Sequence, residues 1–475
     1  MKTGISAIIC VAACAGGAAA QPGASLTGTW AGTAQLSAPG GQQPFTISVE
    51  LGRRRAVVSL GPGHPARTVV PARRSRNRVR FALPGRPGLA FDGRLERGRL
   101  SGTFRQGALR GRFSLRRGRA IEGASVGLYR FADGSPLGIL SAVGPRLGVR
   151  YDTSEIRGLY QTRPGAYAVG AGLETRRPSV GTAVFRPGAV EWRGERAVRV
   201  PVRQEEVLVQ SGRALLACTL SIPPGQGRRP ALTFAHGAGE APRSFNLILA
   251  TYANHLGLVT LSCDKRGIGQ SGGVYPGEFP STPVVDQYAR DVQALARWLG
   301  RQPEVDPARV GVAGASQAGW IMPLAAAREP AIRFMVGLVP PTLTQGETDL
   351  WANLNGQGQS MPTRTDEDME AEVRRAGPSG VDPMPSIRAL RIPAIWLYGG
   401  KDRIVPSRLC VERLDPVARE PGRDLAYRVF PGGTHGLILT TNGLQAEAAA
   451  SSRLVDGLYP AIREWLLARG FSQIS

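Results

Sequence analysis

The chain has 475 residues, of which 42% are hydrophobic, 62 are glycine and 37 are proline. At roughly 100–200 residues per domain, this length predicts two to four domains. Glycine and proline together make about a fifth of the chain, below the share typical of disordered or collagen-like proteins. No internal stretch approaches the ~18 consecutive apolar residues of a membrane-spanning helix. The composition therefore predicts a globular, multidomain protein.

The net charge of +23 and the isoelectric point near 11.0 raise the question of nucleic-acid binding. The charge is unevenly distributed, because residues 21–200 hold 30 arginines against 10 acidic residues, whereas residues 201–475 hold 28 basic and 26 acidic residues. The excess thus belongs to the N-terminal half. We expect a solvated basic surface there and no nucleic-acid partner, with weak association with anionic cell-envelope material as the alternative.

Residues 1–20 have the layout of a secretory signal peptide. Lys2 supplies a positive charge, residues 5–11 form a short apolar stretch, and Ala18-Ala19-Ala20 precedes the expected cleavage. The sequence therefore predicts export to the periplasm or the medium of a bacterium. A lipid anchor on Cys14 and a buried N-terminal helix are alternatives; the apolar stretch is short for the first, and alanine and glycine make a poor core for the second.

Three cysteines remain beyond the signal peptide, at positions 218, 263 and 410. They are too few and too scattered for a disulfide framework in a chain of this length, so we predict no disulfide, with one bridge and an odd thiol as the open alternative. The four histidines have none of the spacings of a structural zinc site. The sequence predicts no metal and no cofactor.

Residues 26–119 predict an antiparallel β domain, either a small barrel or a sandwich. Phe45, Ile47, Val49 and Leu51 alternate with polar residues, which is the period of a strand with one buried face. Similar runs recur at roughly ten-residue spacing; they cover residues 78–83, 89–95, 99–104 and 111–115. Residues 120–204 contain further strand-like pieces without helical periodicity and predict a β-rich linking region.

Residues 205–475 have a different pattern, in which apolar runs alternate with helical patterns. The runs cover residues 231–234, 258–262, 310–313, 334–339, 394–398 and 426–430, and the helical patterns cover 242–256, 283–299, 317–328 and 445–468. This alternation predicts an α/β domain with a mostly parallel sheet and helices on both faces. The polar interval 342–390 interrupts the alternation and predicts a cap over the edge of the sheet.

A serine follows one of the predicted strands in the sequence Gly314-Ala315-Ser316-Gln317-Ala318-Gly319. A nucleophilic serine on a tight strand-to-helix turn needs small residues two positions before and after it, because larger side chains would clash. Gly314 and Ala318 meet this need, although Ala318 stands where glycine is commoner. The pattern therefore indicates Ser316 as a nucleophile, the alternative being an ordinary helix N-cap serine.

Two further residues complete a set of catalytic type. Asp402 follows the predicted strand 394–398, and His435 lies in the loop after the next predicted strand. A serine hydroxyl needs a base within hydrogen-bond reach, and that imidazole needs an acceptor to fix its tautomer. The order serine, aspartate, histidine at the ends of strands indicates a catalytic triad. Taken singly, Asp402 also fits a turn residue and His435 a surface loop residue.

The turn His236-Gly237-Ala238-Gly239 follows the first apolar run of the α/β half. A small, flexible turn at this place can point a backbone N–H at a developing oxyanion, with a second N–H from Gln317, the residue after the nucleophile. We interpret His236 as a structural turn residue, because it precedes the strand that carries the predicted nucleophile.

With these motifs the sequence resembles the α/β-hydrolase superfamily, and within it bacterial secreted serine esterases with an N-terminal β domain. The resemblance covers about residues 205–470 and includes the segment from Asp264 to Gly272, which is similar to the family pattern D-x-R-G-x-G-x-S. It implies Ser316 as nucleophile, His435 as general base and then acid, and Asp402 as its orienter. It further implies Ala238 and Gln317 as the oxyanion hole, with Asp264 and Arg266 in structural roles.

The predicted function is hydrolysis of carboxylic esters through an acyl-enzyme, with a small-molecule ester as substrate. A peptidase or amidase and a thioesterase are alternatives on the same triad, and a non-catalytic envelope-binding protein is the alternative from another class. Trp320, Trp351 and Met361 are candidates for an acyl pocket, with ordinary packing as the simpler expectation. The acyl and alcohol specificity, the role of the β domain and the oligomeric state stay open.

Overall fold

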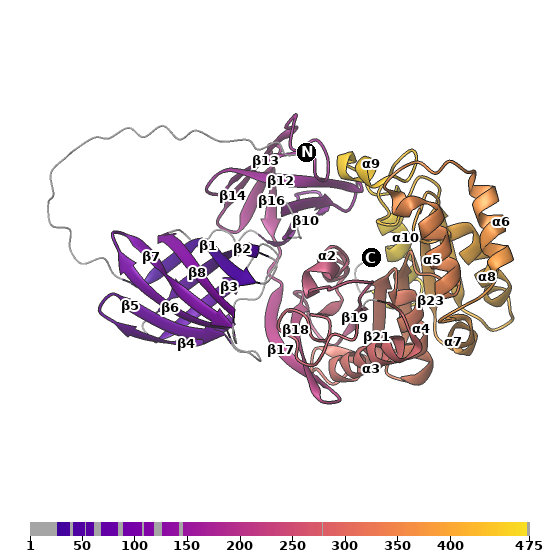
Figure 1. The fold of residues 1–475 in the computed structure, drawn as a ribbon, viewed down its shortest axis with the longest axis horizontal. Coiled ribbons are helices and arrows are strands. Elements are labelled where there is room, and N and C mark those ends of the chain that lie inside the picture. The colour runs from indigo at the N-terminus through magenta and orange to yellow at the C-terminus, as the bar shows by residue number, and fades with distance from the viewer. Residues whose placement is uncertain are drawn as a thin grey trace.

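The computed structural model describes residues 26–38, 41–52, 54–60, 68–83, 89–106, 109–117, 126–141, 146–277 and 279–472. Two closed β-barrels are followed by a larger α/β domain (Figure 1). The predicted signal peptide, including Cys14, lies outside the described residues. None of the helices in the described ranges is long and apolar enough to cross a membrane.

The first barrel contains eight strands, each antiparallel to its neighbours, and closes through pairing of the first with the eighth. The strands are β1 (Gly28–Ala38), β2 (Gly41–Leu51), β3 (Arg55–Leu60), β4 (Thr68–Ser75), β5 (Arg78–Leu83), β6 (Leu89–Glu96), β7 (Arg99–Gln106) and β8 (Leu109–Arg117). Alternate residues of β5 are buried and exposed, as a strand with one inner face requires. Ile47, Val49 and Leu51 belong to a core that this barrel forms alone. Of the two predicted forms, the structure has the barrel.

A second closed barrel occupies the region where the sequence predicted a β-rich linking segment. Its strands are β9 (Gly127–Arg130), β10 (Pro136–Ser141), β11 (Arg146–Arg150), β12 (Glu155–Arg163), β13 (Ala166–Val169), β14 (Gly181–Arg186), β15 (Ala189–Trp192) and β16 (Glu195–Arg199). The barrel closes where β16 pairs with β9, and Trp192 and Tyr129 lie in its interior. The region is therefore a folded unit with a core as well as a link.

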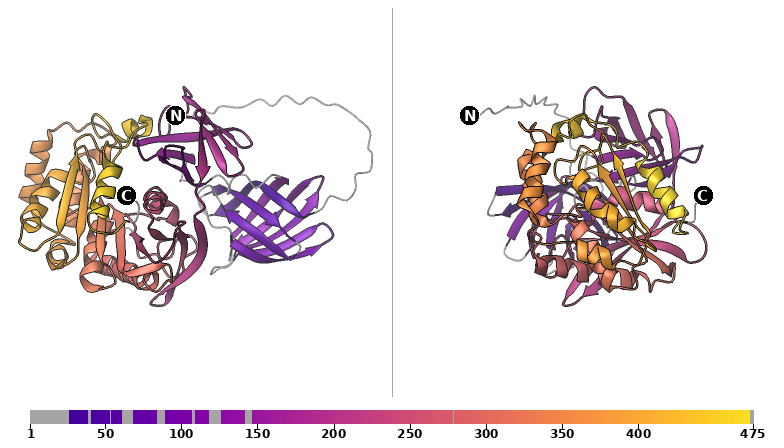
Figure 2. Two further views of the ribbon diagram at one scale, coloured as in Figure 1. Left: turned by 180° about the vertical axis from the view of Figure 1, so that it is seen from behind. Right: turned by 90° about the vertical axis from the view of Figure 1, so that its right-hand side faces the viewer.

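The second barrel packs against the α/β domain through aromatic residues. The Tyr151 ring lies 5.1 Å from the ring of Tyr252 and 4.8 Å from that of Tyr459, measured between centroids. The Tyr151 hydroxyl also donates to the backbone oxygen of Ile248 at 2.9 Å. Residues of this barrel and of the α/β domain share one hydrophobic cluster. The two views of Figure 2 show the second barrel over this domain, with the first barrel at the far end.

The α/β domain is built on an eight-stranded sheet with the order β17-β18-β20-β19-β21-β22-β23-β24. Its strands are β17 (Arg203–Ser211), β18 (Ala214–Ile222), β19 (Arg229–Ala235), β20 (Val259–Cys263), β21 (Val305–Ala315), β22 (Phe334–Leu338), β23 (Ala394–Gly399) and β24 (Leu425–Phe430). β18 is antiparallel to both neighbours, and β19 to β24 are mutually parallel. The mostly parallel sheet predicted from the sequence is confirmed.

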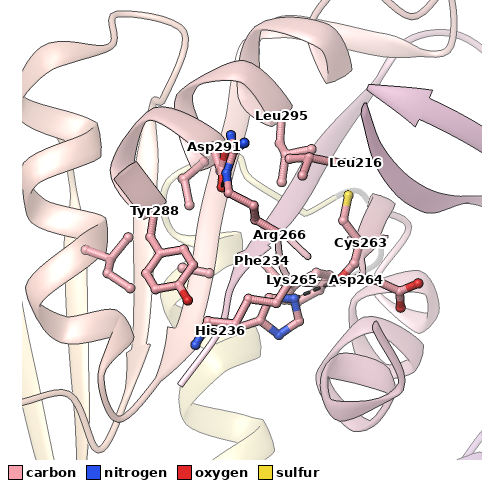
Figure 3. Close-up of a pocket in the computed structure, with 13 residues that line it drawn as sticks. Leu216, Phe234, His236, Cys263, Asp264, Lys265, Arg266, Tyr288, Asp291 and Leu295 are labelled. Atoms are coloured by element: carbon pink, nitrogen blue, oxygen red, sulfur yellow. Dashed lines mark hydrogen bonds and ion pairs between the residues drawn. The ribbon is translucent and has the colours of Figure 1, made fainter. Parts of the chain in front are cut away.

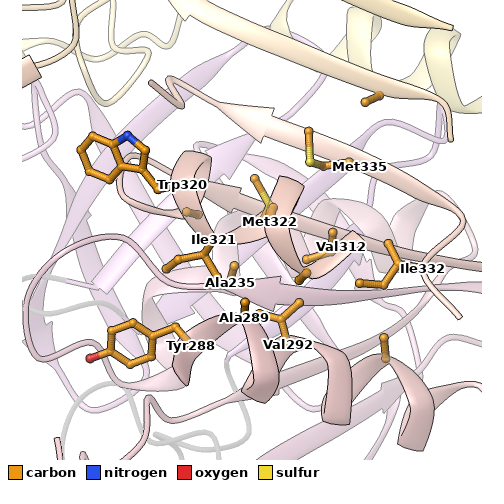
Figure 4. Close-up of a cluster of buried hydrophobic side chains, with 14 of the residues drawn as sticks. Ala235, Tyr288, Ala289, Val292, Val312, Trp320, Ile321, Met322, Ile332 and Met335 are labelled. Atoms are coloured by element: carbon orange, nitrogen blue, oxygen red, sulfur yellow. The ribbon is translucent and has the colours of Figure 1, made fainter. Parts of the chain in front are cut away.

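Helices cover both faces of the sheet. They are the 3-10 helix η1 (Arg243–Asn246), α2 (Leu247–His255), α3 (Thr282–Leu299), α4 (Ala318–Arg328), α8 (Ser407–Ala418) and α10 (Leu458–Leu467), whereas α9 (Gln445–Ala450) buries no residue. Successive strand residues face opposite sides, so Met335 packs with α3, α4 and α8, whereas Val336 packs with α2 and α10. Figure 4 shows the cluster on the first of these faces.

The interval predicted as a cap, residues 342–390, is largely helical. It contains α5 (Gln345–Leu354), the 3-10 helix η2 (Gly356–Gly358), α6 (Asp366–Ala376) and α7 (Met384–Ala389). Thr344 and Glu347 cap α5 reciprocally, side chain to backbone, which fixes where that helix begins. Met369 from α6 and Met384 from α7 are buried in the cluster on the face of the sheet that α3, α4 and α8 cover. The interval is therefore anchored in the core of the domain.

The prediction of no disulfide is wrong. Cys218 on β18 and Cys263 on β20 lie directly opposite each other in the antiparallel pair, with Cα atoms 3.9 Å apart, and form a disulfide. Cys410 is a buried free thiol, and burial raises its pKa to about 11. The two bonded cysteines are 45 residues apart in sequence, and only the crossed strand order brings them together.

Candidate active site

Ser316 stands on a sharp turn between β21 and α4. Its φ of +57° lies in the left-handed region, which non-glycine residues rarely adopt. The turn is held on both sides, because the Ser316 N–H donates to Leu338 O at 3.1 Å and its carbonyl accepts from Gly319 N at 2.8 Å. The side chain is partly exposed. A partly exposed serine in a strained turn after a buried strand has the geometry that presents a nucleophile.

The small residues around Ser316 are required by close packing. A Cβ on Gly314 would lie 2.6 Å from both Ala235 O and Ala318 Cβ, and a Cβ on Gly319 would lie 2.7 Å from Pro341 Cδ. Ala318 itself is fully buried, so its methyl group fits where glycine is commoner. The sequence pattern of small residues therefore has a steric cause in this turn.

Asp402 and His435 form a hydrogen-bonded pair at the same edge of the sheet as Ser316. His435 Nδ1 lies 2.9 Å from Asp402 Oδ2. Asp402 Oδ1 accepts from the N–H groups of Ile404 and Val405 at 2.8 and 2.9 Å, so the buried carboxylate is fully bonded. A carboxylate can only accept, so Nδ1 is the donor in this bond, and in the neutral form of the ring Nε2 is then left as a base. The His435 side chain is 28% exposed and thus accessible.

The loops that carry Asp402 and His435 pack backbone against backbone. A Cβ on Gly399 would lie 2.4 Å from the carbonyl oxygens of both Gly433 and Thr434. Glycine at position 399 therefore allows the two loops to touch. Trp351 from the cap interval adds a donor, with its indole N–H 3.2 Å from Asp402 O. Trp351 is buried and supports the aspartate loop, which is the packing role expected as the simpler case.

The His435 loop is also connected to the second barrel. Val455 N donates to Leu437 O at 2.8 Å, and Leu454 N donates to Ser154 O of the barrel at 2.8 Å. Ile156 N of β12 donates to Ser452 O, also at 2.8 Å. The helix predicted over residues 445–468 is interrupted between α9 and α10 by this segment. Residues 451–457 thus bridge the barrel and the histidine loop.

The turn predicted as part of the oxyanion hole lies against Ser316. A Cβ on Gly237 would lie 3.2 Å from Ala315 O and 3.5 Å from the Cβ of Ser316. Ala238 follows in the same turn, and Gln317 directly precedes the first turn of α4. The two backbone N–H groups named for the oxyanion hole therefore come from segments that are in contact at Ser316.

His236 is a structural residue of this turn. Its Nε2 lies 2.7 Å from Cys263 O, and Asn246 Nδ2 lies 3.5 Å from its Nδ1. Burial lowers the His236 pKa to about 4, so the ring is neutral near pH 7. Figure 3 shows the ring beside a small cavity of about 30 Å³ that Lys265 and Tyr288 also line.

Asp264 and Arg266, expected to have structural roles, each join an ion pair. Asp264 accepts from Arg243 at Oδ1 and Oδ2. Burial opposes ionisation of Asp264, but the bonds and charge of Arg243 outweigh it and hold its pKa below the usual value. Arg266 pairs with Asp291 on α3. Both ion pairs hold the segment after β20 in place, which is the structural role expected of Asp264 and Arg266.

The other two side chains considered for the acyl pocket differ in exposure. Trp320 is buried, with its indole N–H 3.0 Å from Leu343 O, and Met361 is 52% exposed. Within the described residues, no group of three histidine, cysteine, aspartate or glutamate side chains could hold a metal ion. Sequence reasoning gave no role to Lys265, which contacts both halves of the predicted oxyanion hole. No pattern in the sequence signals that contact.

Comparison with known proteins gives partial matches. The family model of the X-Pro dipeptidyl-peptidases (S15 family) matches residues 212–373, which include Ser316 but neither Asp402 nor His435. An uncharacterised protein of Mycobacterium tuberculosis is 30% identical over 212 residues, covering 44% of this chain and 64% of that protein. An uncharacterised 31.7 kDa protein of Escherichia coli is 27% identical over 124 residues, covering 26% of this chain and 41% of that protein. The chain thus spans less than two thirds of these relatives.

Solved structures with similarity to the chain include two esterases. An esterase of Pyrococcus furiosus has a TM-score of 0.41 at 18% identity and covers 56% of this chain and 91% of its own. A thermostable carboxylesterase cloned from a metagenomic library has a TM-score of 0.40 at 17% identity and covers 58% of this chain and 92% of its own.

Proposed function

We propose that this chain, a serine hydrolase of the α/β-hydrolase type, cleaves carboxylic esters through an acyl-enzyme intermediate. The observation that carries the proposal is the Asp402–His435 pair at the sheet edge where Ser316 stands on its strained turn. Strands β21, β23 and β24 are parallel, so their carboxyl ends meet at this edge.

In the proposed reaction, His435 Nε2 takes the proton of the Ser316 hydroxyl as its oxygen attacks the ester carbonyl. The charge that develops on the carbonyl oxygen is stabilised by the backbone N–H groups of Ala238 and Gln317. His435 then protonates the leaving alcohol, and the acyl group stays on Ser316. Water activated by the same imidazole releases the acid, while Asp402 stabilises the transient imidazolium.

Peptide cleavage is the second candidate, favoured by the match to the X-Pro dipeptidyl-peptidase model over residues 212–373. The same triad serves both reactions. A dipeptidyl-peptidase, however, also needs a site for the free amino group of its peptide substrate, and it must protonate a poorer leaving group. Ester cleavage requires only the groups already assigned, and for this reason we favour it.

The test is hydrolysis of p-nitrophenyl esters from acetyl to dodecanoyl, alongside glycyl-prolyl-p-nitroanilide. We expect ester turnover with an optimum chain length, and a loss of ~10⁴–10⁶-fold in kcat for Ser316→Ala. If the anilide is turned over and the esters are not, the ester proposal is wrong and the protein is a peptidase. If neither substrate is turned over and a fluorophosphonate leaves Ser316 unlabelled, the hydrolase proposal itself fails.

We infer that the protein acts outside the cytoplasm. The Cys218–Cys263 disulfide supports this, because such bonds persist in oxidising compartments and are rare in reducing ones. Fractionation of producing cells, with the mass of the mature chain, tests the inference. We expect a periplasmic or secreted protein that has lost residues 1–20; a full-length cytoplasmic protein would contradict it.

A further inference from the structure

Lys265, the second residue after β20, lies between the two segments of the proposed oxyanion hole. Its side chain is buried, and the residue is only 3% exposed. Its Nζ donates to Gly237 O at 2.8 Å, to Gly239 O at 3.1 Å and to Gln317 Oε1 at 3.2 Å. One ammonium group therefore binds the turn after β19 and the residue after the nucleophile at once.

The bond to Gly237 has a consequence for Ala238, because the two residues share a peptide unit. The Gly237 carbonyl and the Ala238 N–H lie in one plane and point in opposite directions across a trans peptide bond. When the carbonyl is fixed on Lys265, the direction of the Ala238 N–H is fixed as well. A cation on the carbonyl also polarises the peptide and strengthens its N–H as a donor.

The remaining contacts hold the ammonium in place. The Tyr288 ring lies 4.5 Å and the Tyr275 ring 5.7 Å from Nζ, at distances of a cation–π contact. The backbone N–H of Lys265 donates to Ala241 O at 3.1 Å and anchors the far end of the same turn. Figure 3 shows Lys265 between Tyr288 and His236. The ammonium group of Lys265 is thus held in place by contacts on several sides.

We propose that Lys265 is a positioning residue that presets the Ala238 N–H for the oxyanion and couples it to the helix turn of Gln317. The proposal rests on the proposed function, since it concerns the transition state of the reaction at Ser316. Lys265 touches no reacting atom; it acts through the peptide that does. Its removal should therefore weaken binding of the transition state while leaving binding of the ground state nearly unchanged.

The test compares Lys265→Met with Arg229→Met in the full chain. Arg229 is a matched control, because it is also a buried cation that donates to backbone carbonyls, those of Pro223 and Gly225, at the opposite end of β19. For Lys265→Met we expect kcat on p-nitrophenyl acetate to fall ~10²-fold with KM within about threefold, as for loss of one oxyanion donor. The inhibition constant of an alkyl boronic acid, which forms a tetrahedral adduct on serine, should rise in parallel.

For Arg229→Met we expect a lower unfolding temperature with kcat within about twofold of the parent protein. If Lys265→Met keeps the parent kcat, or if both variants lose activity only in proportion to their unfolded fraction, the proposal is overturned. Should Lys265→Met not fold, Gln317→Leu removes one of the three acceptors and keeps the backbone N–H. A fall in its kcat at constant KM supports the proposal, and an unchanged kcat contradicts it.

These outcomes are separable from failure of the proposed function. If the parent protein hydrolyses no ester, the proposed function fails before Lys265 is tested. If the parent hydrolyses esters, Ser316→Ala is inactive and Lys265→Met is fully active, the function stands and only the positioning role falls.

Discussion

The two barrels have the same number of strands and the same antiparallel closure, yet they relate differently to the α/β domain. The first barrel has a hydrophobic core of its own, and all members of that cluster lie between residues 26 and 115. The second barrel contributes Tyr151 and Ile156 to a cluster that it shares with α2, α10 and the sheet. Closure of a barrel therefore does not by itself separate its core from that of a neighbouring domain. The second barrel is closed, yet it shares a hydrophobic cluster with the α/β domain, whereas the first barrel does not.

Backbone hydrogen bonds extend this difference to the candidate active site. The second barrel bonds to the bridging segment 451–457, and that segment bonds to the loop of His435. A disturbance of the second barrel should therefore reach His435, whereas a disturbance of the first should stop at its own boundary. Three predictions test this contrast.

The largest effect is expected from removing one buried aromatic side chain from each barrel. Tyr151 and Phe91 are 1% and 2% exposed, so Tyr151→Ala and Phe91→Ala remove comparable apolar contacts. Each costs about 3 kcal/mol or more of local stability. We expect Tyr151→Ala to lower the temperature of half-inactivation of ester hydrolysis by roughly 6–10 °C, and Phe91→Ala to leave it unchanged. Equal losses in both variants would show that the first barrel also supports the site.

A smaller effect is expected from acid at the contact of the second barrel with α2. Arg130 Nη2 of β9 lies 3.4 Å from His255 Nδ1, and burial followed by the charges of Arg130 and Arg463 lowers the His255 pKa to about 4. The unfolded chain, with a histidine pKa near 6.5, binds more protons between these values. Stability is therefore full above about pH 6.5 and falls as the pH drops toward 4.

We expect this group to contribute about 2 kcal/mol to the loss of stability between pH 7 and 5. Urea titrations of ester hydrolysis at the two pH values measure it, and His255→Asn should show a shallower dependence on pH. The described residues of the first barrel contain no histidine, so the protection of its amides from hydrogen exchange, corrected for the intrinsic pH dependence of the exchange rate, should be insensitive to the same change. An unaltered pH dependence in His255→Asn would show that His255 does not contribute to the loss of stability in acid.

The smallest effect concerns charge. In the first barrel, arginines stand directly opposite arginines, as in the pairs Arg99–Arg116 and Arg105–Arg110. In the second barrel, Arg150 pairs with Asp152. Like charges opposite each other destabilise a sheet by a few tenths of a kcal/mol, and salt screens them. We expect higher salt to slow hydrogen exchange in β7 and β8 and not in β11. If higher salt slows exchange in neither barrel, the facing arginines do not destabilise the first barrel.

Much of the fold could be predicted from the sequence, and the reasons for the exceptions are physical. The α/β sheet was predictable because buried parallel strands are continuous apolar runs between amphipathic helices. The closure of the second barrel was not, because β13 and β15 have only four residues each, too few to show a period. The disulfide escaped prediction because β18 and β20 are neighbours only through the crossed order of the sheet.

The candidate site divides in the same way. The small residues around Ser316 are a local requirement of one turn, and a local requirement leaves a pattern in the sequence. Asp402 and His435 were predictable from their places after strands, since parallel strands end at one edge. Lys265 depends on three loops meeting at one ammonium group, and such convergence leaves no periodic or spaced pattern. Sequence patterns therefore indicated the groups proposed to react and missed the group proposed to position them.

The most direct test of the central claim is a rapid-quench experiment with p-nitrophenyl butyrate, followed by mass spectrometry of the peptide that contains Ser316. We predict a transient gain of one butyryl group on that peptide, formed at the rate of the p-nitrophenol burst and absent from Ser316→Ala. Hydrolysis of the ester without acylation of Ser316 would contradict the account.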